Sequence, residues 1–192
     1  MKDKKELLKK EILKKDNKKR VFISIDIPED IKKEIKKIQN LLPDFKGKLT
    51  EKENLHLTLK FLGEQDLETL EKIKEKLKEI EFNKIDCQID SIGVFSEKYI
   101  RIVWLKIIGA EELQKVIDEK IHEIGFEKEK RFMGHLTIAR VKNLKNKKEF
   151  LENLKEIKIP ELRFSVKEFR LKKSFLKPEG PEYKTLESFY LK

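Results

Sequence analysis

The sequence contains few cysteine, glycine and proline residues: one Cys, seven Gly and five Pro among 192 residues. The single cysteine, Cys87, cannot form an internal disulfide, so a reducing compartment, the cytoplasm, is expected. No apolar run approaches the roughly 18 residues of a membrane-spanning helix. The basic N-terminus also lacks the continuous hydrophobic stretch of a secretory signal. We therefore expect a cytoplasmic protein that does not associate with membranes.

Motifs of several enzyme classes are missing as well. The sequence has no GxxxxGK[ST] or GxGxxG segment that would hold nucleotide phosphates, and no GxSxG nucleophile turn. Two of the three histidines belong to repeated motifs, so only His122 and Cys87 remain to complete a zinc site of three or four ligands. We therefore expect neither a metal nor another cofactor. His122 lies off the apolar stripe of its predicted helix and is expected to be exposed to solvent.

Charge is abundant but unevenly placed. Charged residues make up 43% of the chain, hydrophobic residues 38%, and the net charge is +10, of which residues 1–20 contribute +6. A basic excess favours polyanionic partners such as RNA, although many lysines alternate with glutamates on predicted helices, as on any solvated surface. The apolar stripe within residues 1–19 is too short to fold alone. We expect residues 1–19 to form a mobile basic extension.

Two distant segments share a His-Leu-Thr-aliphatic core: ENLHLTLKFLG at residues 53–63 and MGHLTIARV at 133–141. Their histidines are 79 residues apart, and the strand-like segments RVFISIDI and RIVWLKII are 81 residues apart. The repeat therefore extends beyond the two short motifs, and an order of strand, helix, strand, helix occurs twice. Self-similarity at this scale indicates an internal duplication.

Apolar periodicity predicts the remaining elements. Helices are expected over residues 31–42, 67–80, 113–124 (closed by Gly125) and 150–157, and strands over 21–27, 84–95, 99–108, 162–171 and 183–191 in addition to the two motif strands. The predicted fold class is α+β. We expect residues 20–192 to form a single bilobed pseudo-two-fold domain of two mainly antiparallel sheets flanked by helices, with a central active-site groove.

Side chains alternate between the two faces of a strand. Strict alternation predicts the following groove-facing residues: His56, Thr58 and Lys60 in the first motif, and His135, Thr137 and Ala139 in the second. Two imidazoles, with an unperturbed pKa of about 6.5, can act as base and acid on opposite sides of a reacting phosphorus, and two hydroxyls can hold its oxygens. A lone His-x-Thr is more often a strand residue satisfied by neighbouring backbone, but matched copies in a repeat favour a phosphodiester site.

The paired His-x-Thr-x motifs resemble the two-histidine phosphoesterase superfamily, and within it the RNA 2′,3′-cyclic phosphodiesterases, formerly named 2′-5′ RNA ligases. The resemblance runs from about Arg20 to Leu191 and includes RVFISIDIP, ENLHLTLKFLG, RIVWLKI, HLTIAR and LKKSFLKPEGPEYKTLESF. It implies metal-independent hydrolysis of a ribose 2′,3′-cyclic phosphate at RNA 3′ ends, tRNA fragments among them, to a 2′-phosphomonoester. No obligate protein partner is implied.

The resemblance also implies roles for five residues. His56 would be the proton donor to the departing 3′ oxygen and His135 the proton acceptor that activates water, although the near-symmetry of the motifs does not by itself assign these two roles. Thr58 and Thr137 would hold non-bridging phosphate oxygens, and Arg140 would stabilise developing charge. Strict alternation places Arg140 opposite His135, so the strand must twist or end before it.

Other features of the chain leave alternatives open. Lys60 is predicted by alternation to face the groove, where it either assists RNA binding or solvates the sheet edge. The family usually has proline before the second histidine, whereas this chain has Gly134, which bears on the stiffness at the start of that strand. The same site could instead catalyse 2′-5′ RNA ligation or the cleavage of 2′-5′ phosphodiester bonds, or it could bind RNA ends without turnover. Rings that could stack on a terminal base, although such rings more often belong to a core, are Phe45, Phe95, Phe132 and Tyr183.

Overall fold

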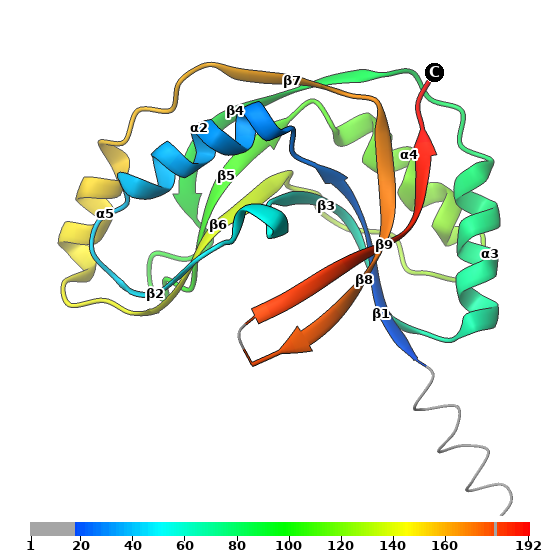
Figure 1. The fold of residues 1–192 in the computed structure, drawn as a ribbon, viewed down its shortest axis with the longest axis horizontal. Helices are drawn as coiled ribbons and strands as arrows, with labels where there is room; N and C mark the ends of the chain where they lie inside the picture. The colour runs from blue at the N-terminus through cyan, green and yellow to red at the C-terminus, as the bar shows by residue number, and fades with distance from the viewer. Residues whose placement is uncertain (1–17, 179) are drawn as a thin grey trace, which may run out of the picture.

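The structure is a computed structural model that describes residues 18–178 and 180–192 (Figure 1). The predicted extension, residues 1–19, lies outside the described residues except for Lys18 and Lys19, and Lys19 is already the first residue of strand β1. Among the described helices, none is long and apolar enough to cross a membrane.

The duplication predicted from the sequence is present in the order of the elements. The first repeat unit consists of β1 (Lys19–Asp26), α2 (Glu29–Asn40), β3 (His56–Gln65) and α3 (Leu67–Lys78). The second consists of β5 (Ile102–Ile108), α4 (Glu111–His122), β6 (His135–Asn143) and α5 (Lys147–Lys155). Other described elements are β2 (Lys46–Leu49), the 3-10 helix η1 (Lys52–Asn54), β4 (Ile85–Val94), β7 (Leu162–Val166), β8 (Glu168–Lys177) and β9 (Gly180–Tyr190).

The strands form two antiparallel sheets. Sheet A has the strand order β3-β1-β8-β9, and sheet B has the order β2-β6-β5-β4-β7. In each repeat unit the first strand pairs with the histidine-bearing strand, β1 with β3 and β5 with β6. The predicted α+β, bilobed fold with two related halves is therefore confirmed.

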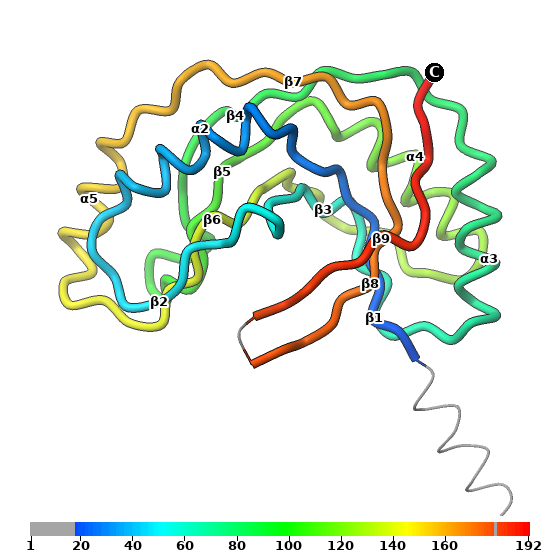
Figure 2. Tube along the Cα trace, in the orientation of Figure 1, coloured from blue at the N-terminus to red at the C-terminus, as the bar shows by residue number. Residues whose placement is uncertain are grey.

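The first helix of each unit, α2 or α4, covers the sheet that holds the strands of the other unit, whereas the second helix, α3 or α5, covers the sheet of its own unit. Helix α2 contacts β6 and α5 contacts β4, both in sheet B, whereas α4 contacts β3 and α3 contacts β9, both in sheet A. The Cα trace shows α2 and α5 on one side of the molecule and α3 and α4 on the other (Figure 2). Buried apolar side chains from both sheets form one contiguous core. The first repeat unit therefore contributes to both lobes, and so does the second.

Two features of the sheets differ from the sequence prediction. Strand β2 was not expected, because its sequence KGKL is short, mostly exposed and without apolar alternation. The predicted strand over residues 162–171 is two strands, which separate at Lys167 so that β7 pairs with β4 in sheet B and β8 pairs with β1 in sheet A. Hydrophobicity alternates within each strand and changes phase at Lys167 and Glu168, but this pattern carries no information about which sheet a strand joins.

Candidate active site

Both motifs line one cavity of about 650 Å³ between the sheets. All five residues singled out in the sequence, His56, Thr58, His135, Thr137 and Arg140, are part of its wall. Further side chains that line it include Arg20, Phe22, Lys48, Asn54, Phe61 and Tyr183. The fold thus brings two motifs 79 residues apart into a common concave site.

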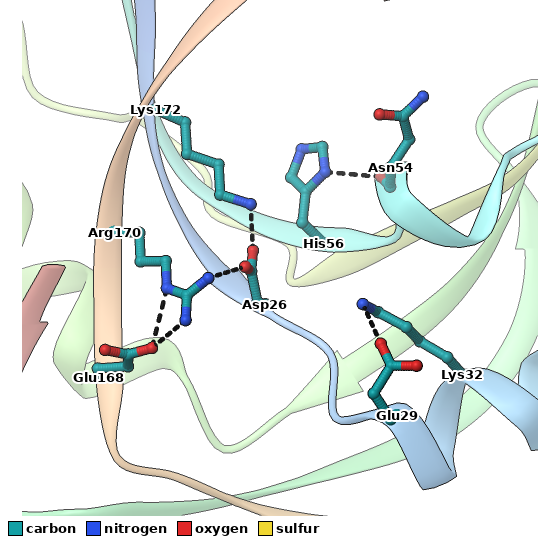
Figure 3. Close-up of polar contacts among 8 residues, drawn as sticks. All are labelled: Asp26, Glu29, Lys32, Asn54, His56, Glu168, Arg170 and Lys172. Carbon is teal, nitrogen blue, oxygen red and sulfur yellow. Dashed lines mark hydrogen bonds and ion pairs between the residues drawn. The ribbon is translucent and has the colours of Figure 1, made fainter. Parts of the chain in front are cut away.

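Each histidine is held by the backbone immediately before its own strand. The Nδ1 atom of His56 lies 2.8 Å from the carbonyl oxygen of Asn54 (Figure 3), and Nδ1 of His135 lies 2.9 Å from the carbonyl oxygen of Met133. A carbonyl oxygen only accepts hydrogen bonds, so Nδ1 carries the hydrogen and donates in both rings. This leaves Nε2 of each imidazole as the atom that gains or loses a proton.

The environment of His56 disfavours its cationic form. Burial lowers the pKa of His56 to about 4, although the hydrogen bond to the Asn54 carbonyl raises it. The ammonium of Lys172 lowers this pKa further, and the carboxylate of Asp26, opposite His56 in the β1–β3 register, raises it. Asp26 is ion-paired with both Lys172 and Arg170, as Figure 3 shows. In the free protein His56 is therefore neutral at neutral pH.

A β-bulge in each motif strand resets the alternation of side chains. Leu59 has no partner in the β1–β3 register, and Ile138 has none in the β5–β6 register, so each is an extra residue on its strand. Arg140 follows the second bulge and consequently lies on the same face as His135, lining the cavity. Strict alternation had placed Arg140 on the face opposite His135, and the bulge explains why the two residues share a face instead. Ala139, predicted to face the groove, is instead fully buried.

The prediction that Lys60 faces the groove was wrong for the same reason. The bulge at Leu59 turns Lys60 to the opposite face, where only 5% of the residue is exposed. Its ammonium forms an ion pair with Asp118 of α4 and donates to the carbonyl oxygen of Glu127 at 2.8 Å. Asp118 also accepts from the backbone N–H of Glu129 at 2.9 Å. Lys60 therefore ties the first motif to the loop that leads to the second.

The bulges also place Phe61 in the cavity wall, where sequence reasoning had not put it. Phe61 is 73% exposed and follows His56 at the same interval at which Arg140 follows His135.

Tyr183, named as a possible stacking ring, lines the cavity too, with its centroid 5.0 Å from that of His56. Burial raises the pKa of Tyr183, so its hydroxyl stays protonated. The other three rings named in the sequence are not part of the cavity wall: Phe45 and Phe132 pack against the core, and Phe95 contacts His135 edge-on.

Gly134 fixes the start of the second motif strand by close approach to β5. Its carbonyl oxygen accepts from the N–H of Ile107 at 2.9 Å. A Cβ built on Gly134 would lie 2.4 Å from the carbonyl oxygen of Ile107, well inside contact distance. Gly134 thus permits a close backbone contact that positions the segment just before His135.

The remaining histidine and the cysteine lie away from the cavity. His122 is exposed, as predicted, and its Nδ1 atom is 2.8 Å from the carbonyl oxygen of Phe126. Cys87 is a free, buried thiol, and burial raises its pKa to about 12. Within residues 18–178 and 180–192 there is no group of three or more His, Cys, Asp or Glu side chains that could hold a metal ion.

Comparison with known proteins agrees with this geometry. The family model of LigT-like phosphoesterases matches residues 25–104 and 108–183, which contain both motifs and parts of both lobes. The chain belongs to the LigT-like phosphoesterase family. Every residue placed in the wall of the cavity above, apart from Arg20 and Phe22, lies within the matched segments of this LigT-like phosphoesterase.

Relatives of the LigT-like phosphoesterase match most of its length. An RNA 2′,3′-cyclic phosphodiesterase of Methanocaldococcus jannaschii is 40% identical over 174 residues, which are 88% of this chain and 99% of the relative. One of Archaeoglobus fulgidus is 36% identical over 177 residues, with the same two coverages. A solved structure of a Thermus thermophilus protein has a TM-score of 0.76 and 26% identity, covering 89% of this chain and 97% of that one.

Proposed function

We propose that the protein hydrolyses the ribose 2′,3′-cyclic phosphate at RNA 3′ ends, tRNA fragments among them, to a 2′-phosphomonoester in the cytoplasm. The observation that supports this most is the pair of imidazoles in one cavity, each with Nδ1 bound to backbone and Nε2 left for proton transfer. Relatives at 34–40% identity over most of the chain are RNA 2′,3′-cyclic phosphodiesterases. No obligate protein partner is required.

In the proposed step a water molecule attacks phosphorus while the bond to the 3′ oxygen breaks. Nε2 of His135 accepts a proton from the water, and Nε2 of His56 donates a proton to the departing 3′ oxygen. One P–O bond forms and one breaks, so the phosphate remains attached through the 2′ oxygen. The two histidines exchange protonation states in each turnover, and proton exchange with solvent restores them.

Three cavity residues hold the phosphate in this proposal. The hydroxyls of Thr58 and Thr137, each two residues after a histidine, donate to the non-bridging oxygens. The guanidinium of Arg140 stabilises the charge that accumulates on these oxygens as water adds. The positive charge of Arg140 also helps to lower the pKa of His56. A bound phosphate anion opposes that effect.

The donor role of His56 makes a prediction about its titration. Because its pKa is about 4 in the free protein, His56 gains a proton only below that pH. A donor must carry a proton near neutral pH, so a bound anion has to raise this pKa. We expect NMR titration of the His56 ring to give a midpoint of about 4 in the free protein and a midpoint at least about one unit higher with a nucleoside 2′-phosphate bound.

The exposed His122 ring serves as an internal control in this titration, because it lies outside the cavity. The NMR signals of this ring should not move when the nucleotide is added at constant pH. If the nucleotide bound and the His56 midpoint stayed at about 4, His56 would be the proton acceptor and His135 the donor, contrary to the proposed assignment.

The proposed reaction is tested directly with a nucleoside 2′,3′-cyclic phosphate in the presence of EDTA. We expect turnover to continue under chelation and the product to be the 2′-phosphate, identified by chromatography against both isomers. Formation of the 3′-phosphate would reverse the assignment of the leaving oxygen, and loss of turnover in EDTA would show a metal requirement. Binding of the nucleotide without turnover would leave an RNA-end-binding module as the function.

A further inference from the structure

A second cavity of about 680 Å³ lies against the first, lined by residues of α2 and of the segment from β2 to η1. Four consecutive residues, Lys48–Glu51, line both cavities, so a single stretch of chain separates them. The other residues in its wall are Lys32, Lys33, Lys36, Gln39, Gly47, Lys52 and Leu55. We refer to it as the lysine cavity.

Five lysines line this cavity, against one lining carboxylate, that of Glu51. A second carboxylate, Glu29, pairs with both Lys32 and Lys52 at 2.9 and 2.6 Å, and the hydrogen bonds from Lys52 and Lys32 lower the pKa of Glu29 to about 2. Five lysines and two glutamates leave a net charge of +3 in this small region. The cavity is therefore strongly electropositive.

Two of these lysines lack the ion pairs that are usual on the other helices. Lys33 and Lys36 are exposed on α2 and have no ion pair among the described residues. On α3, by contrast, the lysines pair with glutamates, as Lys72 does with Glu68 at 2.8 Å. Ion pairing of that kind is ordinary surface solvation, whereas Lys33 and Lys36 remain available to an external anion.

We propose that the lysine cavity binds the phosphodiester backbone of the RNA on the 5′ side of the cyclic phosphate. This inference rests on the proposed function, because a cyclic phosphate occupies the 3′ terminus and the rest of the chain must leave the catalytic cavity in the 5′ direction. The shared residues Lys48–Glu51 place the two cavities on either side of one stretch of chain, so RNA that leaves the catalytic cavity over this stretch reaches the lysine cavity. RNA could also leave the catalytic cavity past Arg20, on another part of its wall. There the positive charge of Arg20 is paired with Glu64 at 3.7 Å, so the attraction for a phosphate is weaker than at the lysine cavity.

The test compares a short single-stranded RNA bearing a terminal 2′,3′-cyclic phosphate with a nucleoside 2′,3′-cyclic phosphate. For the variant Lys33→Gln/Lys36→Gln we expect kcat/KM on the RNA to fall by about tenfold at low salt, with kcat/KM on the nucleoside unchanged. Loss of two phosphate contacts should also reduce the slope of log affinity against log salt by about 1.4, at about 0.7 per contact for a single strand.

The matched control is Lys115→Gln/Lys128→Gln, which removes the same charge from two exposed lysines that line neither cavity. Affinity is measured in parallel with an RNA ending in a 2′-phosphate, so the binding result is interpretable even if hydrolysis is not observed. The inference is overturned if both double variants lose affinity equally, if the parent binds the RNA no better than the nucleotide, or if the α2 variant loses activity on the nucleoside as well.

Discussion

Replacement of His56 or His135 by alanine is expected to lower kcat for 2′,3′-cyclic phosphate hydrolysis on the order of 10²–10⁴-fold each. The reason is that each Nε2 atom handles one of the two protons that move in the same displacement. The two losses should not add in the double variant, because neither proton transfer is effective without the other. Single-turnover kinetics on a nucleoside 2′,3′-cyclic phosphate measure the chemical step directly.

His122→Ala is the matched control, since it removes an exposed imidazole outside the cavity. Its kcat should equal that of the parent. Thermal unfolding of all three variants separates a loss of chemistry from a loss of folded protein. The paired acid–base assignment fails if a folded His56→Ala or His135→Ala variant retains parental kcat.

Replacement of Lys60 by methionine is expected to lower the free energy of unfolding by about 3–5 kcal/mol. The substitution leaves the buried carboxylate of Asp118 without its ion-pair partner, since the side chains of Lys60 and Asp118 are 4% and 9% exposed. The carbonyl oxygen of Glu127 also loses a donor. Urea unfolding at neutral pH gives the free-energy difference from the parent.

The double variant Lys60→Met/Asp118→Leu should recover part of this loss, because it removes the uncompensated charge together with its partner. Lys72→Met serves as the comparison at an exposed pair, Lys72–Glu68, where the expected change is within about 1 kcal/mol. Equal, small effects of Lys60→Met and Lys72→Met would show that the Lys60–Asp118 pair contributes no more than a surface ion pair.

The sequence predicted the repeat, the two histidine strands and the presence of His56, Thr58, His135 and Thr137 in the cavity wall because each depends on local patterns. Residue identity at matched positions of a duplication is enough to pair His56 with His135. Periodicity is enough to place the apolar faces of the helices, and Gly125, with φ of +94°, follows α4 as expected. Such features need no knowledge of which strand lies beside which.

The errors came from features that only strand pairing decides. Counting alternate residues assigned Lys60 to the groove, because nothing in HLTLKFLG shows that Leu59 is an extra residue relative to β1. The same counting placed Arg140 on the face opposite His135, whereas the bulge at Ile138 brings the two residues to the same face. The partner of Lys60, Asp118, is 58 residues away on a helix of the other repeat unit, and local sequence carries no signal for such a contact.

Phe61 and Arg140 occupy corresponding positions in the two motifs, and their different side chains make the two halves of the groove unequal. A site with perfect two-fold symmetry would bind its substrate equally well in two opposite orientations, and each histidine would face the attacking water in half of the complexes. Here one half presents a guanidinium and the other an exposed ring, so the two orientations differ in free energy. In the proposed mechanism, this difference at one duplicated position gives the two imidazoles their separate roles as acid and base.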